Sequence, residues 1–489
     1  MNLNELTISQ ASTGLRKKEF SSGELTSACL EAIQKNDGAI HAYLEVFQEE
    51  ALRQAKAADD LFADVHHELP HLLGIPIAVK DNILVEGKRC TAGSRILEDY
   101  TASYDATVVR KLKQQGAIIL GKTNLDEFAM GSSTEHSAFG PTTNPHDQER
   151  VPGGSSGGSA AAIAANMGIA ALGSDTGGSI RQPASFCGIV GMKPTYGRVS
   201  RHGLIAMASS LDQIGPMTKT VEDTKILFDA VAGEDMFDAT AIHQDSGLRV
   251  QGLEAELKNL QVGMPKEYFG EGLDEDVKRT IQAAIKKIEN AGATIKEISL
   301  PHSSYALPAY YIIVPSEVSA NLARFDGIRY GARNDTRYTI HDTSLYDSYS
   351  KTRAYGFGPE VKRRIMLGTY ALSAGYYDAY YLKAQKVRRL IKEEFDRAFK
   401  DVDVIVGPTT PTPAFKQSER AQDPLKMYLA DIYTVAINLA GLPALSLPCG
   451  IVSRDGSSLP VGLQLITPPM DDEKLFEIGK VVENLISGM

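Results

Sequence analysis

The stretch GGSSGGSAAAIAANMGIAALGSDTGGSIRQP, residues 153–183, decides how this 489-residue chain is interpreted. It holds two Gly-Ser clusters, at 153–159 and 173–179, and each borders an apolar run of small residues. A flexible linker would not lie between segments that must be buried, so these clusters do not indicate a linker. Thirteen of the 43 glycines fall within residues 153–215. Because glycine has no side chain, this enrichment indicates that the backbone here closely approaches a ligand or another segment.

The two clusters are compatible with two kinds of site. A phosphate could bind at the N-terminus of a helix, and a tightly packed, Ala-rich helix is predicted over 160–166. Alternatively, Ser179 could be a nucleophile, because the backbone N–H groups of Thr176, Gly177 and Gly178 precede it and could converge on a developing oxyanion. The pattern alone leaves these two interpretations comparable.

Outside this stretch, short apolar runs alternate with segments of helical periodicity. Helices are predicted over 1–65, 107–115, 160–166, 276–291, 375–400 and 472–486, and strands over 73–79, 117–120, 170–172, 260–264, 294–298, 402–406, 444–447 and 461–466. This alternation predicts an α/β fold. No linker divides the chain and no period of 20–50 residues repeats, so we expect one domain over 1–489, with an excursion of helices and loops near 300–400.

Composition excludes several classes of protein. A hydrophobic content of 43% with 23% charged residues is typical of a globular chain, and no apolar run approaches the length of a membrane span. The net charge of −10 argues against a large surface that binds nucleic acid directly. Cys29, Cys90, Cys187 and Cys449 form no CxxC pair, so we expect free thiols in the cytoplasm and no metal site.

Residues 116–123, GAIILGKT, match the phosphate-loop pattern GxxxxGK[ST] letter for letter. The four variable positions are apolar and predict a strand, whereas a phosphate loop follows a strand and presents its N–H groups to the ligand. We therefore expect a buried strand here. A nucleotide-binding module built on Gly121, Lys122 and Thr123 is kept as an alternative function.

Residues 153–183, together with GIPIAVKDN at 74–82, closely resemble the amidase signature family. Lys80 precedes Ser155 by 75 positions, and Ser155 precedes Ser179 by 24, which suits that family's Ser–Ser–Lys triad. The resemblance implies that Ser179 is the nucleophile and that Lys80 is the base, acting through Ser155 on a cis peptide bond. It also implies the amidase signature fold, a large mixed central sheet covered by helices on both faces, with a signature core at about 70–220.

The implied base must be neutral to accept a proton. Lowering a lysine pKa from about 10.4 to about 7 requires about 4 kcal/mol of destabilisation of the ammonium form. Burial at the end of an apolar strand can supply much of this. The carboxylate of Asp81 would oppose it, so we expect Asp81 to face away from Lys80.

The resemblance narrows to one branch of the family, the glutaminase subunits of tRNA-dependent amidotransferases. It covers nearly the whole chain, with characteristic stretches at 121–135, 190–204, 360–373 and 438–450. It implies a glutamine substrate, with Tyr310 in the binding site, Arg364 on the α-carboxylate and Asp431 on the α-amino group. On pattern alone, the basic cluster at 362–364 would be a solvated helix face.

The same resemblance implies the partners. A B subunit would activate glutamate with ATP and Mg and hold Glu-tRNA(Gln), and a small C subunit would complete a heterotrimer. No cofactor is expected in this chain, and no membrane contact. The alternative function is a stand-alone amidase that hydrolyses a small amide.

Overall fold

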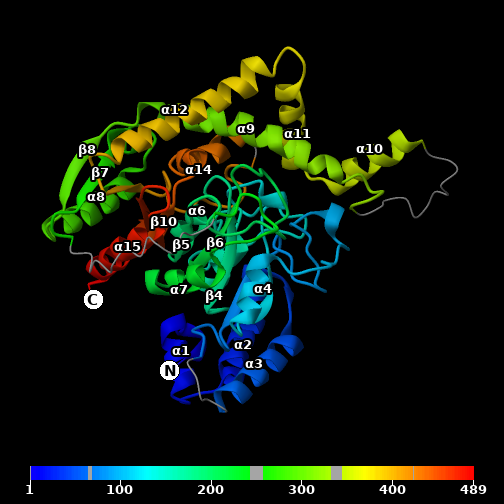
Figure 1. Cartoon of the computed structure of the whole chain (residues 1–489), viewed down its shortest axis with the longest axis vertical. Helices are drawn as coiled ribbons and strands as arrows, with labels where there is room; N and C mark the ends of the chain where they lie inside the picture. Colours follow the sequence, from blue (N-terminus) through cyan, green and yellow to red (C-terminus); the bar gives the residue numbers. More distant parts are fainter. Residues whose placement is uncertain (1, 64–68, 243–256, 332–343, 422, 489) are drawn as a thin grey trace.

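The computed structural model describes residues 2–63, 69–242, 257–331, 344–421 and 423–488. Eleven strands within these residues form one mixed sheet (Figure 1). In sheet order they are β1 (Tyr43–Val46), β3 (Ile118–Thr123), β2 (Pro76–Lys80), β4 (Ala170–Asp175), β6 (Gln213–Thr218), β5 (Val190–Lys193), β10 (Ala444–Arg454), β11 (Ser457–Ile466), β9 (Val404–Pro408), β7 (Gln261–Pro265) and β8 (Thr294–Ile298). Strand β2 pairs in parallel with β3 and β4, and β7 does so with β8 and β9; the other pairs are antiparallel.

The described residues also form fifteen α-helices: α1 (Ile8–Arg16), α2 (Ser22–Ile40), α3 (Gln48–Ala63), α4 (Thr107–Gln114), α5 (Gly157–Ala164), α6 (Arg181–Cys187), α7 (Val221–Val231), α8 (Glu275–Asn290), α9 (Ala306–Asn321), α10 (Leu345–Gly356), α11 (Pro359–Leu372), α12 (Lys383–Ala398), α13 (Pro424–Tyr428), α14 (Val435–Ala440) and α15 (Asp472–Ser487). Helices α9, α11 and α12 lie side by side along one end of the molecule, and α10 extends away from them (Figure 1).

Both faces of the sheet are apolar, and each face packs on its own set of helices. Along β9, Val404 and Val406 belong to one hydrophobic cluster and Ile405 to another, as the alternation of side chains along a strand requires. The first cluster includes side chains of α7, α8 and α15, and the second includes side chains of α9, α12 and α14. The predicted large mixed sheet with helices on both faces is therefore confirmed.

The strands predicted over 260–264 and 294–298 and the helix predicted over 276–291 are confirmed as β7, β8 and α8, and they form a β-α-β unit because the two strands are parallel. The helix predicted over 375–400 differs: a π-helical turn, η7 (Asp378–Leu382), precedes α12. The helical region predicted over 1–65 contains the short edge strand β1, which pairs antiparallel with β3.

The phosphate-loop pattern forms no loop. Residues Ile118–Thr123 are the buried strand β3, and Lys122 Nζ lies 2.9 Å from Asp81 Oδ1. The alternative of a nucleotide-binding module at this sequence is therefore wrong, because the lysine that would meet a phosphate is enclosed in an ion pair. No helix in the described part of the chain is long and apolar enough to cross a membrane. All four cysteines are free.

Candidate active site

Lys80 ends strand β2, every residue of which is buried. Its Nζ lies 2.7 Å from Ser155 Oγ, 2.9 Å from Ser156 Oγ and 3.0 Å from Ser174 Oγ. Burial lowers the pKa of Lys80 to about 7, against the opposing charges of carboxylates farther away. Near neutral pH the amine is therefore able to lose its proton and act as a base.

The carboxylate next to Lys80 in sequence faces the other way. Asp81 forms the ion pair with Lys122 and accepts hydrogen bonds from the N–H and hydroxyl of Thr91. Successive side chains of a strand point to opposite faces of the sheet, so Lys80 and Asp81 separate. The expected orientation of Asp81 is confirmed, and its carboxylate is paired with Lys122.

Ser155 is fully buried, and the peptide bond between Gly154 and Ser155 is cis. The backbone here runs against Asp126, since a Cβ at Gly154 would lie 2.1 Å from Asp126 Oδ2. Gly153 has a φ of +84°, in the region that favours glycine. The first Gly-Ser cluster is therefore a tightly packed loop that brings Ser155 against Lys80.

Ser179 follows strand β4 and is 8% exposed. The carbonyl of Ser179 accepts the N–H of Ser156 at 3.1 Å, which joins the two Gly-Ser clusters. Within the described residues, Lys80 and Ser155 are hydrogen-bonded, whereas the Ser179 hydroxyl has no hydrogen-bond partner. The structure thus places Ser179 beside the pair of Lys80 and Ser155, with no hydrogen bond between the Ser155 and Ser179 hydroxyls among the described residues.

A buried ion pair shapes the turn before Ser179. Asp175 and Arg181 are both fully buried, with 3.0 Å between Asp175 Oδ2 and Arg181 Nε. Burial alone would raise the pKa of Asp175, but the charge and hydrogen bonds of Arg181 outweigh it and lower that pKa to about 2. The permanent carboxylate then accepts the N–H groups of Gly178 at 2.8 Å and Ile180 at 3.2 Å.

This arrangement corrects part of the predicted oxyanion hole. The N–H of Gly178 is engaged by Asp175, so it is not free for a substrate oxygen in this structure. The N–H groups of Thr176, Gly177 and Ser179 have no acceptor in the described part of the chain. The Thr176 hydroxyl donates to Asp212 at 2.7 Å, which fixes the start of the turn.

The three residues expected to recognise the substrate lie on separate elements. Tyr310, on α9, packs its ring against the turn, because a Cβ at Gly177 would lie 2.5 Å from its Oη. Arg364, on α11, is buried and donates to Glu360 at 2.8 Å. Asp431, in the 3₁₀ turn η8 (Leu429–Asp431), is buried and accepts the Ser132 hydroxyl at 2.7 Å.

Arg364 and Asp431 interact electrostatically, and Arg364 also contacts two tyrosine rings. Burial raises the pKa of Asp431 to about 7, and the charge of Arg364 partly offsets this rise. The Arg364 guanidinium also lies over the rings of Tyr311 and Tyr428, at 5.2 and 5.5 Å. A fixed cation and a carboxylate beside a serine hydroxyl are suited to an amino-acid zwitterion.

Comparison with known proteins identifies the family. Residues 24–476 match the family model described as Amidase, which is most of the chain. The chain belongs to the amidase family. It is 53% identical over 489 residues to the A subunit of glutamyl-tRNA(Gln) amidotransferase from Koribacter versatilis, covering 100% of both chains.

Solved structures of the amidase family agree in fold. The crystal structure of the glutamyl-tRNA(Gln) amidotransferase A subunit from Thermotoga maritima matches with a TM-score of 0.79 and 44% identity, over 99% of this chain and 95% of that one. The native peptide amidase from Stenotrophomonas maltophilia matches with a TM-score of 0.79 and 28% identity, over 99% and 97%. The predicted amidase signature fold is confirmed.

Several residues of this amidase site were not predicted from the sequence. Glu360 could have been found, because it precedes Arg364 by four residues on a predicted helix face, the spacing of a helical ion pair. Ser132 and Asp126 lie in the characteristic stretch 121–135 and carry no spacing signal of their own. Only the fold brings Ser132 to Asp431, which is 299 residues away in the chain.

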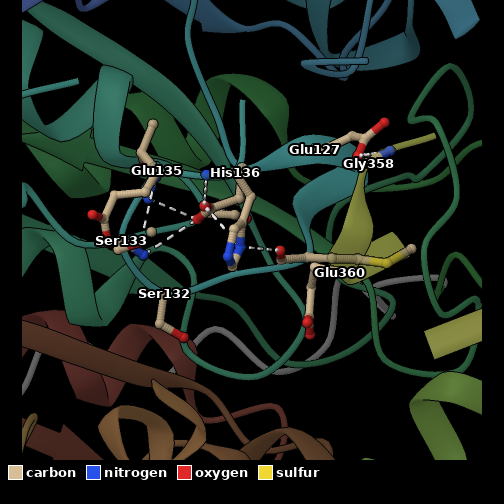
Figure 2. A network of polar contacts seen from close by, with 12 residues as sticks. Glu127, Ser132, Ser133, Glu135, His136, Gly358 and Glu360 are labelled. Atoms are coloured by element: carbon tan, nitrogen blue, oxygen red, sulfur yellow. Dashed lines mark hydrogen bonds and ion pairs between the residues drawn. The ribbon is translucent and has the colours of Figure 1, made fainter. Parts of the chain in front are cut away.

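The described residues contain no group of three or more His, Cys, Asp or Glu side chains that could hold a metal ion. The polar groups around the site instead bond one another. Figure 2 shows Ser132, Ser133, Glu135 and His136 on one side of this network, and Glu127, Gly358 and Glu360 on the other.

Proposed function

We propose that this chain is the glutaminase subunit of a tRNA-dependent amidotransferase that converts Glu-tRNA(Gln) to Gln-tRNA(Gln). The observation that carries the proposal is the contact of buried Lys80 with Ser155 beside Ser179, in a site that also holds Arg364 and Asp431. The names of the relatives at 53–56% identity support the tRNA-dependent role.

In the proposed first half-reaction, neutral Lys80 accepts the proton of Ser155, and Ser155 accepts the proton of Ser179. The Ser179 oxygen then bonds to the side-chain amide carbon of glutamine, and free N–H groups of the turn stabilise the oxyanion. The C–N bond breaks as the leaving amine takes a proton back through Ser155. Ammonia departs, and a glutamyl ester of Ser179 remains.

In the second half-reaction, water attacks the ester and the same base takes its proton. The C–O bond to Ser179 breaks, the Ser179 oxygen recovers a proton, and glutamate leaves. Throughout, Arg364 holds the α-carboxylate of the substrate and Asp431 holds its α-amino group. Tyr310 closes the space between the turn and these two charges.

The chain is further proposed to act in the cytoplasm as part of a heterotrimer. A B subunit receives the ammonia, uses ATP and Mg to activate the glutamate and holds Glu-tRNA(Gln), while a small C subunit completes the complex. The glutaminase chain itself needs no cofactor for hydrolysis. Its net charge of −10 fits a protein that leaves the tRNA to a partner.

The second candidate function is a stand-alone amidase, favoured by the likeness to the peptide amidase from Stenotrophomonas maltophilia. Both functions use the same triad, so the recognition residues distinguish them. An enzyme for neutral amides has no need of the buried pair formed by Arg364 and Glu360.

The test is co-expression with the B and C subunits of the same organism, followed by glutaminase and tRNA amidation assays. Ser179→Ala should abolish ammonia release from glutamine while the unfolding temperature stays within a few degrees, because one hydroxyl is lost from a partly open site. Added ammonium should still support tRNA amidation by the variant complex. Retained glutaminase activity would refute the nucleophile. A fully active monomer on unrelated amides would favour the stand-alone amidase.

A further inference from the structure

Helix α11 begins with a cap that its own sequence does not supply. Its N-cap residue is Gly358, which has no side chain to accept a backbone N–H. Glu127 Oε2 accepts the Gly358 N–H at 2.8 Å (Figure 2). A Cβ at Gly358 would lie only 2.4 Å from this oxygen, so glycine leaves the space that the carboxylate occupies.

The carboxylate of Glu127 is fixed at its other oxygen as well. Ser94 Oγ donates to Glu127 Oε1 at 2.5 Å and lies 3.1 Å from the carbonyl of Gly356, the last residue of α10. Glu127 is only 2% exposed. Burial raises the pKa of Glu127 to about 7, against the hydrogen bonds from Ser94 and Gly358, and the helix dipole stabilises its ionised form at the start of α11. Glu127 therefore joins the end of α10 to the start of α11.

Helix α11 carries the cation of the recognition site. Arg364 lies six residues after Gly358 and is held by Glu360, on the same face one turn earlier. The helix is rigid over this distance, so the position of its first turn sets the position of the guanidinium.

The residue before Glu127 serves the opposite side of the site. Asp126 accepts the N–H groups of Thr134 at 2.9 Å and His136 at 3.1 Å, and lies against Gly154 in the Ser155 loop. A few residues later, Ser132 donates to Asp431. One short segment thus contacts the catalytic loop, the carboxylate of the recognition site and the helix that carries its cation.

We propose that Glu127 is a positioning residue for glutamine recognition: it fixes the start of α11 and, through it, the distance between Arg364 and Asp431. The proposal rests on the proposed function, in which Arg364 binds the α-carboxylate of glutamine. Glu127 itself does not contact the substrate.

The test compares Glu127→Ala and Glu127→Gln in the assembled complex with glutamine as the substrate. Loss of the cap should raise KM about tenfold in Glu127→Ala, the size of effect that loss of a helix cap can produce, and leave kcat within about twofold. Glu127→Gln keeps an acceptor oxygen for the Gly358 N–H and should recover most of the affinity. Gly358→Ala should raise KM like Glu127→Ala, because its Cβ displaces the carboxylate.

A double-mutant cycle separates positioning from a general loss of stability. In an Arg364→Ala background, Glu127→Ala should raise KM no further, because the residue through which it acts is gone. The matched control is Asp223→Asn. Asp223 is buried and accepts the N–H groups of Ile8 and Ser9 at the start of α1, so it caps a different helix. It should lower the unfolding temperature and leave KM unchanged.

The possible outcomes distinguish a failure of the positioning role from a failure of the proposed function. An unchanged KM in both Glu127 variants, with a raised KM in Arg364→Ala, would overturn the positioning role and leave the proposed function intact. An undiminished effect of Glu127→Ala in the Arg364→Ala background would do the same. An unchanged KM in Arg364→Ala would overturn the role of Arg364 itself, and with it both proposals.

Discussion

The catalytic side and the recognition side of the site are assembled from different kinds of structure. The catalytic side is built on the ends of two neighbouring parallel strands, β2 and β4, and on the glycine-rich segments next to them. The recognition side comes from helices and turns beyond residue 300. The proposed catalytic side comprises Lys80, Ser155 and Ser179, and the proposed recognition side comprises Tyr310, Arg364 and Asp431.

The recognition helices also face solvent over much of their surface. Of the 23 exposed large hydrophobic side chains among the described residues, 14 lie between Tyr305 and Leu390. Their inner faces pack into the second hydrophobic cluster together with α14, and the buried pair of Arg364 with Glu360 lies within α11 itself. Under the proposed function, the sheet therefore positions the reacting groups, and the helices position the groups that bind the substrate.

The largest expected effect comes from a substitution that alters only the catalytic side. Lys80→Met keeps the length and apolar stem of the buried side chain but removes the base. General-base catalysis contributes about 10²–10⁴-fold, so kcat for glutamine should fall by that factor. The KM should change little, because the recognition residues are untouched. Steady-state kinetics and a melting curve measure both, and a kcat within tenfold of the native value would exclude Lys80 as the base.

The second prediction concerns the pH dependence of kcat, set by Lys80 on the catalytic side, and of KM, set by Asp431 on the recognition side. Burial lowers the pKa of Lys80 to about 7, so the neutral, basic form accumulates as pH rises through 7. The kcat should therefore rise about tenfold per unit below pH 7 and level off above it. Burial also raises the pKa of Asp431 to about 7, so its carboxylate forms, and KM falls, over the same range.

Asp431→Asn distinguishes these two titrations. This variant should lose most of the pH dependence of KM and keep the rising limb of kcat, because Asp431 acts on binding and Lys80 on chemistry. A smaller dependence should remain, because burial also raises the pKa of Glu127 to about 7. The measurement is kcat and KM between about pH 5.5 and 8.5 at constant ionic strength. Loss of the limb in kcat would mean that Asp431, and not Lys80, controls the chemical step.

The sequence predicts the catalytic side far better than the recognition side. Lys80, Ser155 and Ser179 lie in stretches whose glycines and apolar runs indicate an unusual backbone, and the resemblance to the amidase signature family supplies their roles. The apolar run of strand β2 predicts a buried strand, and its burial is what lowers the pKa of Lys80. The orientation of Asp81 was expected from electrostatics, and the alternation of side chains along the strand explains it.

The parts that the sequence could not predict depend on contacts between distant segments. The engagement of the Gly178 N–H by Asp175 depends on Arg181, which keeps that carboxylate charged. The contact of Ser132 with Asp431 joins residues 299 positions apart, so it leaves no pattern in the local sequence of either. The strands β5 and β6 were missed because residues such as Gly191, Gly215 and Pro216 break the usual strand composition.

The smallest expected effect lies where the two sides touch. Gly177 is on the turn before Ser179, and a Cβ there would lie 2.5 Å from the Oη and Cζ atoms of Tyr310 on α9. The Gly177 carbonyl also accepts the Thr434 hydroxyl at 2.5 Å, so the turn cannot easily shift away. In Gly177→Ala the tyrosine ring must therefore move, and overpacking of this kind typically costs about 1–3 kcal/mol.

Because the ring belongs to the recognition side, Gly177→Ala should raise KM for glutamine by about tenfold and lower kcat by less, which steady-state kinetics will resolve. Tyr310→Phe removes one of the atoms in the clash and should relieve part of this defect when combined with Gly177→Ala. The two substitutions should then be non-additive, as expected for residues in direct contact. Strict additivity, or a fall in kcat alone, would show that the added methyl group disturbs the turn rather than the ring, and that the two sides are more independent than their contact suggests.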